Sequence, residues 1–122
     1  MKITNNLNQS LKKLENMDNN KLIAEFMGFQ ETSIGWYDAD ECLHEKDNTF
    51  DTLRFDTDWN WLMPVVEKIE NYNDGYTLVI IEDERCHINT QNGYKVDVVM
   101  HTKIRAVYDS CCNFIEWYYK ND

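Results

Sequence analysis

The sequence is poor in the residues that shape tight loops, because its 122 residues include four glycines and one proline, Pro64. The glycines are scattered, so no Gly-rich loop of the kind that cradles nucleotide phosphates is present. Serine is also scarce, and none of Ser10, Ser33 and Ser110 lies in the Gly-x-Ser-x-Gly elbow of serine hydrolases. These absences remove the usual sequence support for nucleotide-binding enzymes and nucleophilic hydrolases, and we expect a protein that is not an enzyme.

Long apolar runs and basic side chains are also lacking. Nowhere do 18 apolar residues follow one another, and the N-terminus has no apolar stretch behind a basic patch. We therefore expect a cytoplasmic protein without a membrane partner. Only 12 Lys and Arg stand against 22 Asp and Glu, which gives a net charge of −10. Because phosphate backbones require clustered cations, direct binding of nucleic acid is not expected.

Length and periodicity predict one domain that contains helices. A chain of 122 residues of which 43% are hydrophobic can bury a single core. Apolar side chains three and four residues apart predict helices at 20–29, 58–72 and 102–119. Thr102 is the expected cap of the last helix, and Pro64 should kink the second or delay its start. Leucines at helical spacing within residues 1–17 predict a loosely docked leader helix.

Segments rich in β-branched and aromatic residues lie between the helices. They predict strands at 76–81, 85–90 and 94–101, with further short strands at 33–38 and 53–55. The predicted fold is therefore α+β, a small antiparallel sheet of about three to four strands with three helices packed on one face.

The register of one hairpin can be predicted from its turn. A two-residue Asn-Gly turn ending at Gly93 would place polar side chains opposite apolar ones. A three-residue loop with Gly93 in a left-handed bulge position instead pairs Ile88 with Val96 and Cys86 with Val98. We predict the second register, because it places apolar side chains together.

The acidity of the chain is concentrated in residues 31–58. This acidic stretch holds nine Asp and Glu against Lys46 and Arg54, a net charge of −7 out of −10. Aromatic side chains interrupt the acids, so the stretch offers a basic partner both a negative field and rings that can pack. The predicted partner-binding residues are Trp36, Tyr37, Asp38, Asp40, Glu41, Glu45, Asp47, Phe50 and Asp51. The alternative is that the charges serve solubility alone.

Candidate zinc ligands occur at Cys42, His44, Cys86 and His87. Structural zinc sites use cysteine pairs two to four residues apart, whereas neighbouring residues on a strand point to opposite faces and cannot chelate together. The remaining cysteines are adjacent on the last helix, and we expect all four thiols to be reduced.

A calcium-loop pattern begins at Asp56, with oxygen ligands at Asp58, Asn60 and Glu67 in matching positions. Trp61 stands where that loop requires glycine, and the hydrophobic run that follows belongs to a helix. We expect Asp58 or its neighbour Thr57 to cap that helix, and we predict no metal and no cofactor.

General acid and base candidates are isolated in the sequence. The acids at 82–84 lie between two predicted strands, which indicates an exposed turn and not a catalytic carboxylate pair. The histidines His44, His87 and His101 have no sequence-local partner. No catalytic residue is predicted.

Three helical segments carry a resemblance to known proteins: NKLIAEFMG at 20–28, WNWLMPVVEKIE at 59–70, and TKIRAVY at 102–108 followed by FIEWY at 114–118. Together they resemble a family of small, mostly uncharacterised proteins of bacteriophages, prophages and other mobile elements. The family has no catalytic motif to carry over. The resemblance implies a setting in which small acidic proteins bind host proteins that handle nucleic acid. The acidic stretch departs from the family pattern.

The leading hypothesis is a non-enzymatic protein that binds and inhibits or modulates a basic, nucleic-acid-handling host protein in the bacterial cytosol. A CRISPR or other defence effector would be such a host protein, which would make the chain an anti-CRISPR-like, anti-defence protein. Clustered carboxylates mimic phosphate charge and speed association with cationic surfaces. The alternative is a structural or regulatory module that forms a homodimer through Phe114, Trp117 and Tyr118, with the acids serving solubility.

Overall fold

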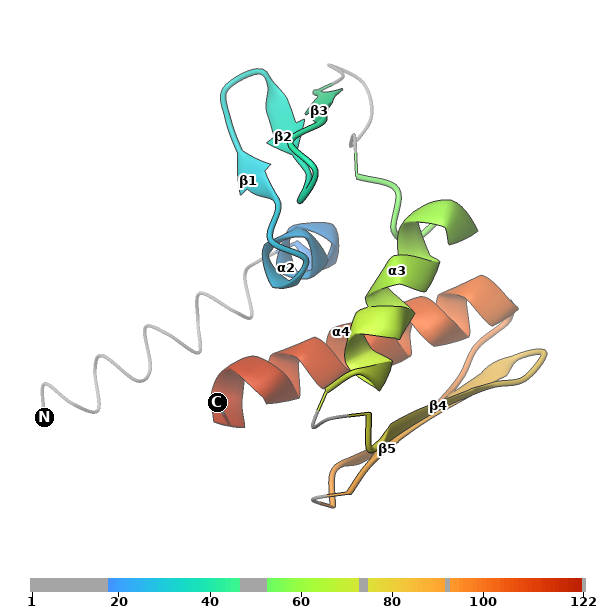
Figure 1. Ribbon diagram of the computed structural model, residues 1–122. Helices are drawn as coiled ribbons and strands as arrows, with labels where there is room; N and C mark the ends of the chain where they lie inside the picture. The colour runs from blue at the N-terminus through green and yellow to red at the C-terminus, as the bar shows by residue number, and fades with distance from the viewer. Residues whose placement is uncertain (1–17, 47–52, 73–74, 92, 122) are drawn as a thin grey trace, which may run out of the picture.

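The computed structural model describes residues 18–46, 53–72, 75–91 and 93–121, so the predicted leader helix lies outside the described residues. The described part contains three helices and two three-stranded antiparallel sheets, which confirms the α+β class (Figure 1). In chain order the elements are α2 (Asn19–Phe26), β1 (Gln30–Glu31), β2 (Gly35–Tyr37), β3 (Leu43–Glu45), α3 (Trp59–Glu70), β4 (Thr77–Ile81), β5 (Arg85–Thr90), β6 (Lys95–Val99) and α4 (Lys103–Asn121). None of these helices is both long and apolar enough to cross a bilayer.

The helix α4 lies at the centre of the packing. Its buried residues recur at helical spacing, from Ala106 and Val107 to Phe114 and Ile115. The hydroxyl of Thr102 accepts a hydrogen bond of 3.3 Å from the backbone N–H of Arg105, which confirms the predicted cap. On its side that faces the sheet, α4 contacts β5 and β6. It also contacts α2 and α3 (Figure 1). Most of the hydrophobic core therefore forms around this one helix.

Within the sheet β4–β5–β6, the β5–β6 hairpin has the register that the sequence predicts. Ile88 lies opposite Val96 and Cys86 lies opposite Val98. Gly93 has a φ of +99°, the left-handed conformation that the three-residue loop requires. The acids at 82–84 form the exposed turn between β4 and β5, also as predicted.

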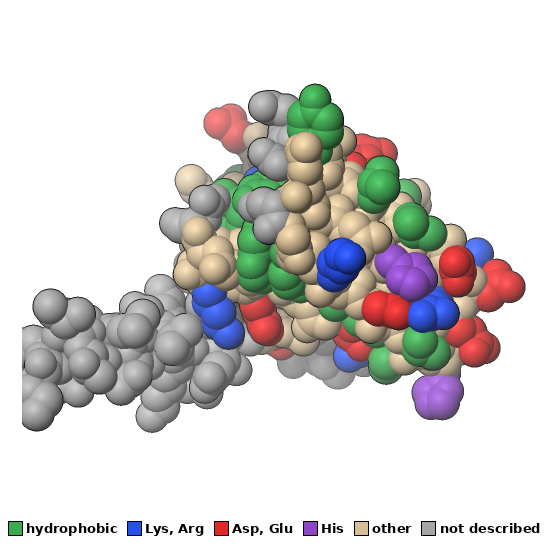
Figure 2. All heavy atoms as spheres, turned by 90° about the horizontal axis from the view of Figure 1, so that it is seen from below, with side chains coloured by type: hydrophobic (Ala, Val, Ile, Leu, Met, Phe, Trp, Pro, Cys, Tyr) green, Lys and Arg blue, Asp and Glu red, His purple; other side chains and the backbone are tan. Residues whose placement is uncertain are grey.

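The face of this sheet that points away from α4 is open and mixed in character. Leu78, Ile80 and Val99 are exposed there. Between them Arg85 makes two hydrogen bonds with Asp97, of 2.9 and 2.6 Å. Figure 2 views the molecule from this side and shows apolar side chains scattered among charges of both signs. The negative charge is thus not gathered on this face.

The second sheet, β1–β2–β3, is small and built on close contact between its strands. The prediction of a strand within 33–38 is confirmed as β2. A Cβ at Gly35 would lie 2.2 Å from the backbone carbonyl oxygen of His44, so the approach of β2 to β3 requires glycine. The predicted strand at 53–55 is wrong. There the carbonyl of Arg54 accepts from Thr57 and Asp58, which turns the chain toward α3.

The caps of α2 and α3 fix where each helix begins. Asp58 accepts a 2.8 Å hydrogen bond from the Asn60 N–H, which confirms it as the cap of α3. The expected late start at Pro64 is wrong, because the helix already begins at Trp59. One hydrogen bond lost at Pro64 is outweighed by this cap and by the buried apolar side of the helix. Asp18 caps α2 in the same way.

A buried asparagine connects three parts of the core. Asn20 is 7% exposed, and its side-chain amide donates to the carbonyl of Leu53 at 3.2 Å and to the carboxylate of Asp56 at 3.3 Å. Its Oδ1 accepts a 3.0 Å hydrogen bond from the hydroxyl of Tyr108 on α4. Burial raises the pKa of Tyr108, so this hydroxyl stays protonated and keeps its donor role. Asn20 therefore joins α2 to α4 and to the turn before α3.

We predict that Asn20→Ala lowers the free energy of unfolding by about 1 to 3 kcal/mol, because it leaves buried polar groups without partners. Urea denaturation at neutral pH measures this change. Asn19→Ala is the matched control, since Asn19 is the exposed neighbour on the same helix and its loss should change the free energy by less than about 0.5 kcal/mol. Equal effects of the two substitutions would contradict a joining role for Asn20.

Candidate functional site

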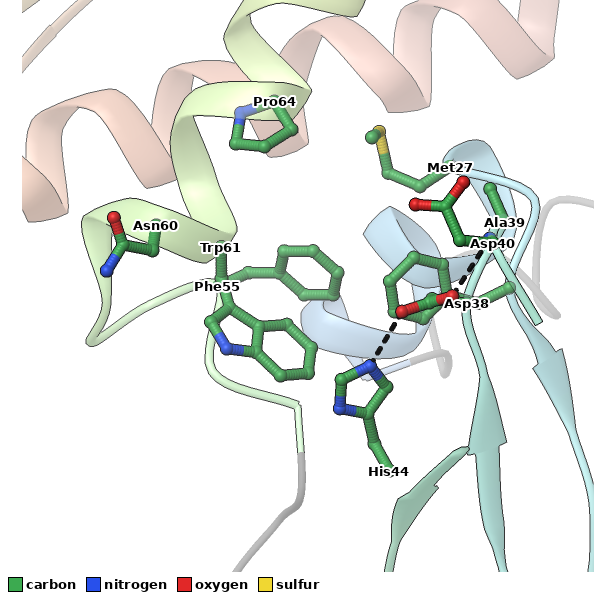
Figure 3. A pocket seen from close by; sticks show the side chains of 10 residues that line it. Met27, Asp38, Ala39, Asp40, His44, Phe55, Asn60, Trp61 and Pro64 are labelled. Carbon is green, nitrogen blue, oxygen red and sulfur yellow. Dashed lines mark hydrogen bonds and ion pairs between the residues drawn. The ribbon is translucent and has the colours of Figure 1, made fainter. Parts of the chain in front are cut away.

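The candidate site is a pocket of about 370 Å³ between the β2–β3 hairpin and the first turns of α3 (Figure 3). It is lined by Met27, Phe29, Asp38, Ala39, Asp40, His44, Phe55, Asn60, Trp61 and Pro64. The hairpin contributes the carboxylates and the histidine, whereas α3 and the turn before it contribute Trp61 and Phe55. The site thus combines an aromatic wall with an acidic rim.

The aromatic wall is a set of rings in mutual contact. Trp61 packs edge-on against Phe55, with ring centroids 5.2 Å apart, and Phe29 lies 5.7 Å from Phe55. His44 stacks on Phe29 at 6.2 Å and meets Trp61 at 4.8 Å. Phe55 is buried behind the other rings. Each ring is therefore held by at least one other, and the wall is preorganised.

The acidic rim is shaped by the loop from Asp38 to Cys42. One carboxylate oxygen of Asp38 accepts hydrogen bonds from the backbone N–H groups of Asp40 at 2.9 Å and Cys42 at 3.0 Å. Its other oxygen lies 2.9 Å from Nε2 of His44. These contacts, that with His44 most of all, hold the pKa of Asp38 below its ordinary value. Asp38 therefore stabilises the loop and orients the imidazole.

The loop also contains a residue in an unusual conformation. Glu41 has a φ of +64°, in the left-handed region that favours glycine or asparagine. Its N–H donates to the carbonyl of Asp38 at 3.0 Å, and the N–H of Asp38 donates to the carbonyl of Cys42 at 3.0 Å. Glu41 is exposed on this tight turn.

The structure divides the predicted partner-binding residues into four groups. Asp38 is partly buried, and its carboxylate is hydrogen-bonded within the loop. Tyr37, Asp40, Glu41 and Glu45 are exposed on the hairpin. Trp36 is only 4% exposed and belongs to the hydrophobic core, so its prediction as a surface anchor is wrong: on β2 it faces inward, where Tyr37 faces out. Asp47, Phe50 and Asp51 lie outside the described residues.

The three aromatic residues of α4 that were predicted to form a dimer contact pack against other parts of the same chain. Phe114 is 0% exposed, which corrects its prediction as a dimer contact. Trp117 stacks on Tyr94 with ring centroids 4.6 Å apart. Tyr118 meets Phe26 edge-on at 5.5 Å. The wide apolar arc of this helix is explained by contacts to α2 and to the end of the β5–β6 hairpin.

Sequence reasoning missed the aromatic wall. Phe29 and Trp61 are far apart in the sequence, and no local periodicity connects them. A signal was nevertheless present, because Phe29, Phe55 and Trp61 lie close to the two ends of the acidic stretch. When the two ends of a long segment such as the acidic stretch lie close together, the residues at those ends become neighbours.

The pocket places the pair of His44 and Asp38 beside its aromatic rings. A His–Asp pair orients an imidazole in many hydrolases, but the described lining includes no Ser, Thr, Cys or Lys that could act as a nucleophile beside His44. Among the described residues no three His, Cys, Asp or Glu side chains gather where they could hold a metal ion. All four cysteines are free, with Cys42 exposed and the others buried.

We predict that Asp38→Ala lowers the free energy of unfolding by about 1 kcal/mol at neutral pH, a loss comparable to that of a helix cap. Asp38→Asn should cost less, because its amide oxygen still accepts from Asp40 and Cys42. Since the pKa of Asp38 is lowered in the folded state, the charge of its carboxylate stabilises the protein above the unfolded pKa of about 3.9. This contribution is lost as the pH falls through the lower folded pKa.

Urea denaturation of the three proteins at neutral pH and in the acid range below about pH 4 measures both effects. The difference between the wild type and Asp38→Asn should shrink in acid. A difference that is independent of pH would contradict a stabilising role for the charge of the Asp38 carboxylate.

No family model, no curated protein and no solved structure matches this chain.

Proposed function

We propose that this chain is a non-enzymatic binding protein that uses the β2–β3 hairpin to hold a basic surface of another protein. The observation that carries the proposal is the arrangement of Asp40, Glu41 and Glu45, which are exposed on one short hairpin beside an aromatic pocket. Charges at the rim and packable rings at the centre are the two components of a protein interface.

The local balance of charge supports this proposal. Lys46 follows β3, and its ammonium lies 2.7 Å from the carboxylate of Glu31. The hydrogen bond from Lys46 lowers the pKa of Glu31, so this pair is neutral as a unit. The charge of Lys46 is thereby compensated, and the charges of Asp40 and Glu41 add to a negative field at the tip of the hairpin.

The partner class that fits this field is a protein with an Arg- and Lys-lined cleft that otherwise receives nucleic acid. Exposed carboxylates present to such a cleft the charge of phosphate groups, and complementary fields raise the rate of association. A host protein, with a defence effector as the case of most interest, is the partner that we propose. Occupation of the cleft would inhibit that partner.

We predict that the triple variant Asp40→Lys, Glu41→Lys and Glu45→Lys loses the partner. The tagged protein is immobilised, exposed to nuclease-treated bacterial lysate at about 0.1 M and about 1 M salt, where the Debye lengths are about 10 and 3 Å, and retained proteins are identified by mass spectrometry. We expect a basic nucleic-acid-handling protein to be retained at low salt only, and its affinity, measured with purified partner, to fall at least about tenfold in the variant.

The matched control is the triple variant Glu82→Lys, Asp83→Lys and Glu84→Lys. It changes the net charge by the same amount, but in the exposed turn between β4 and β5, where the Asp83 side chain is 100% exposed. It should retain the partner. Equal loss in both variants would show that only net charge matters. Retention of nothing but the protein itself would contradict the proposal and favour self-association.

A further inference from the structure

We propose that the pocket between the β2–β3 hairpin and α3 receives an arginine side chain from the basic surface of the partner. This inference rests on the proposed function and identifies the contact by which the partner would be anchored. It follows from the juxtaposition of Trp61, Phe29 and Asp40 around one cavity.

The wall of the pocket suits the flat face of a guanidinium group. Guanidinium is planar and weakly hydrated, and it stacks on aromatic rings, which attract it through their negative faces. Trp61 and Phe29 are partly exposed, and their ring centroids lie 6.2 Å apart. The buried ring of Phe55 supports both. Met27 and Pro64 complete a surface along which the methylene stem of an arginine can pack.

The rim of the pocket supplies the opposite charge. The carboxylate of Asp38 is used by two backbone N–H groups and by His44. Asp40 is different, because no described residue donates a hydrogen bond to its carboxylate, and it lies across the pocket from Trp61 (Figure 3). Asp40 is therefore the acceptor for a charge-assisted hydrogen bond from a guanidinium N–H.

Other occupants fit less well. An anionic group would meet the carboxylates of Asp38 and Asp40. An apolar side chain would remove water from Asp40 without replacing its hydrogen bonds. A lysine ammonium is a strongly hydrated point charge that would lose its water against the aromatic wall, whereas guanidinium bears such a loss more easily.

The test uses N-acetyl-L-arginine N-methylamide as the probe, with the isosteric but neutral citrulline compound and the lysine compound as controls. Each is titrated into the full-length, ¹⁵N-labelled protein and followed by NMR. We expect saturable shifts of the Trp61 indole N–H and of the Asp40 and His44 amides with the arginine probe, at millimolar concentration. Binding of the lysine probe should be several-fold weaker, and the citrulline probe should give no saturable shift.

Two pairs of variants localise the site. Asp40→Asn should weaken binding of the arginine probe about tenfold, whereas Asp83→Asn in the turn between β4 and β5 should leave it unchanged. Trp61→Leu should abolish saturable shifts, whereas Trp59→Leu, two residues earlier on α3, should not. Amide shifts elsewhere in the spectrum report whether each variant remains folded, and Asp40→Asn tests the site even where Trp61→Leu disturbs the fold.

The outcomes separate this inference from the function on which it rests. Equal binding of the citrulline and arginine probes, or unchanged arginine binding by Asp40→Asn, overturns the arginine pocket. If partner capture still depends on Asp40, Glu41 and Glu45 in that case, the proposed function stands without it. If the arginine probe binds as expected but no basic partner is captured, the pocket stands and the proposed function falls.

Discussion

Burial of α4 against the β4–β6 sheet and against α2 and α3 is the contact on which the other elements depend. Each apolar side chain buried in this way contributes on the order of 1.5 to 3 kcal/mol, and most of the core residues of α4 are completely buried. Two polar contacts set the orientation of the helix. Tyr108 donates to Asn20 on α2, and Ser110 donates to the carbonyl of Cys86 on β5 at 3.3 Å. The helix α4 is therefore held by hydrogen bonds to α2 and to β5. The hairpin that carries the acids follows α2 in the chain, so it is connected to the core through this helix.

The acids of the hairpin differ in role although they are close in sequence. The carboxylate of Asp38 accepts hydrogen bonds from two backbone N–H groups and contacts an imidazole, so it already has partners within the loop. Asp40 is turned toward the pocket, and Glu41 toward solvent. Glu31 is paired with Lys46. A count of carboxylates in the sequence therefore overstates the field at the surface, and the direction of each carboxylate decides what it can meet.

The parts of the fold that could be predicted are those specified by residues close together in the sequence. The register of β5 and β6 depends on alternation and on one turn residue, Gly93, which are all local, and it was predicted correctly. The turn around Leu53 resembles a strand in composition, and only the buried contact of its carbonyl with Asn20 reveals its role. The inward orientation of the Trp36 side chain depends on which face of the three-residue strand β2 the rest of the protein covers. The pocket is formed by residues from both ends of the acidic stretch, and the periodicity of side chains relates only residues that are close in the sequence.

The conformation of Glu41 has a consequence for how this surface came to have its sequence. A left-handed backbone costs a residue with a side chain about 1 kcal/mol or more, a cost that glycine avoids and asparagine reduces. The chain nevertheless has a glutamate there, at a φ of +64°. Folding alone would favour the residue that relaxes the turn. A glutamate here therefore makes the hairpin less stable than glycine would, and it places a carboxylate at the exposed tip.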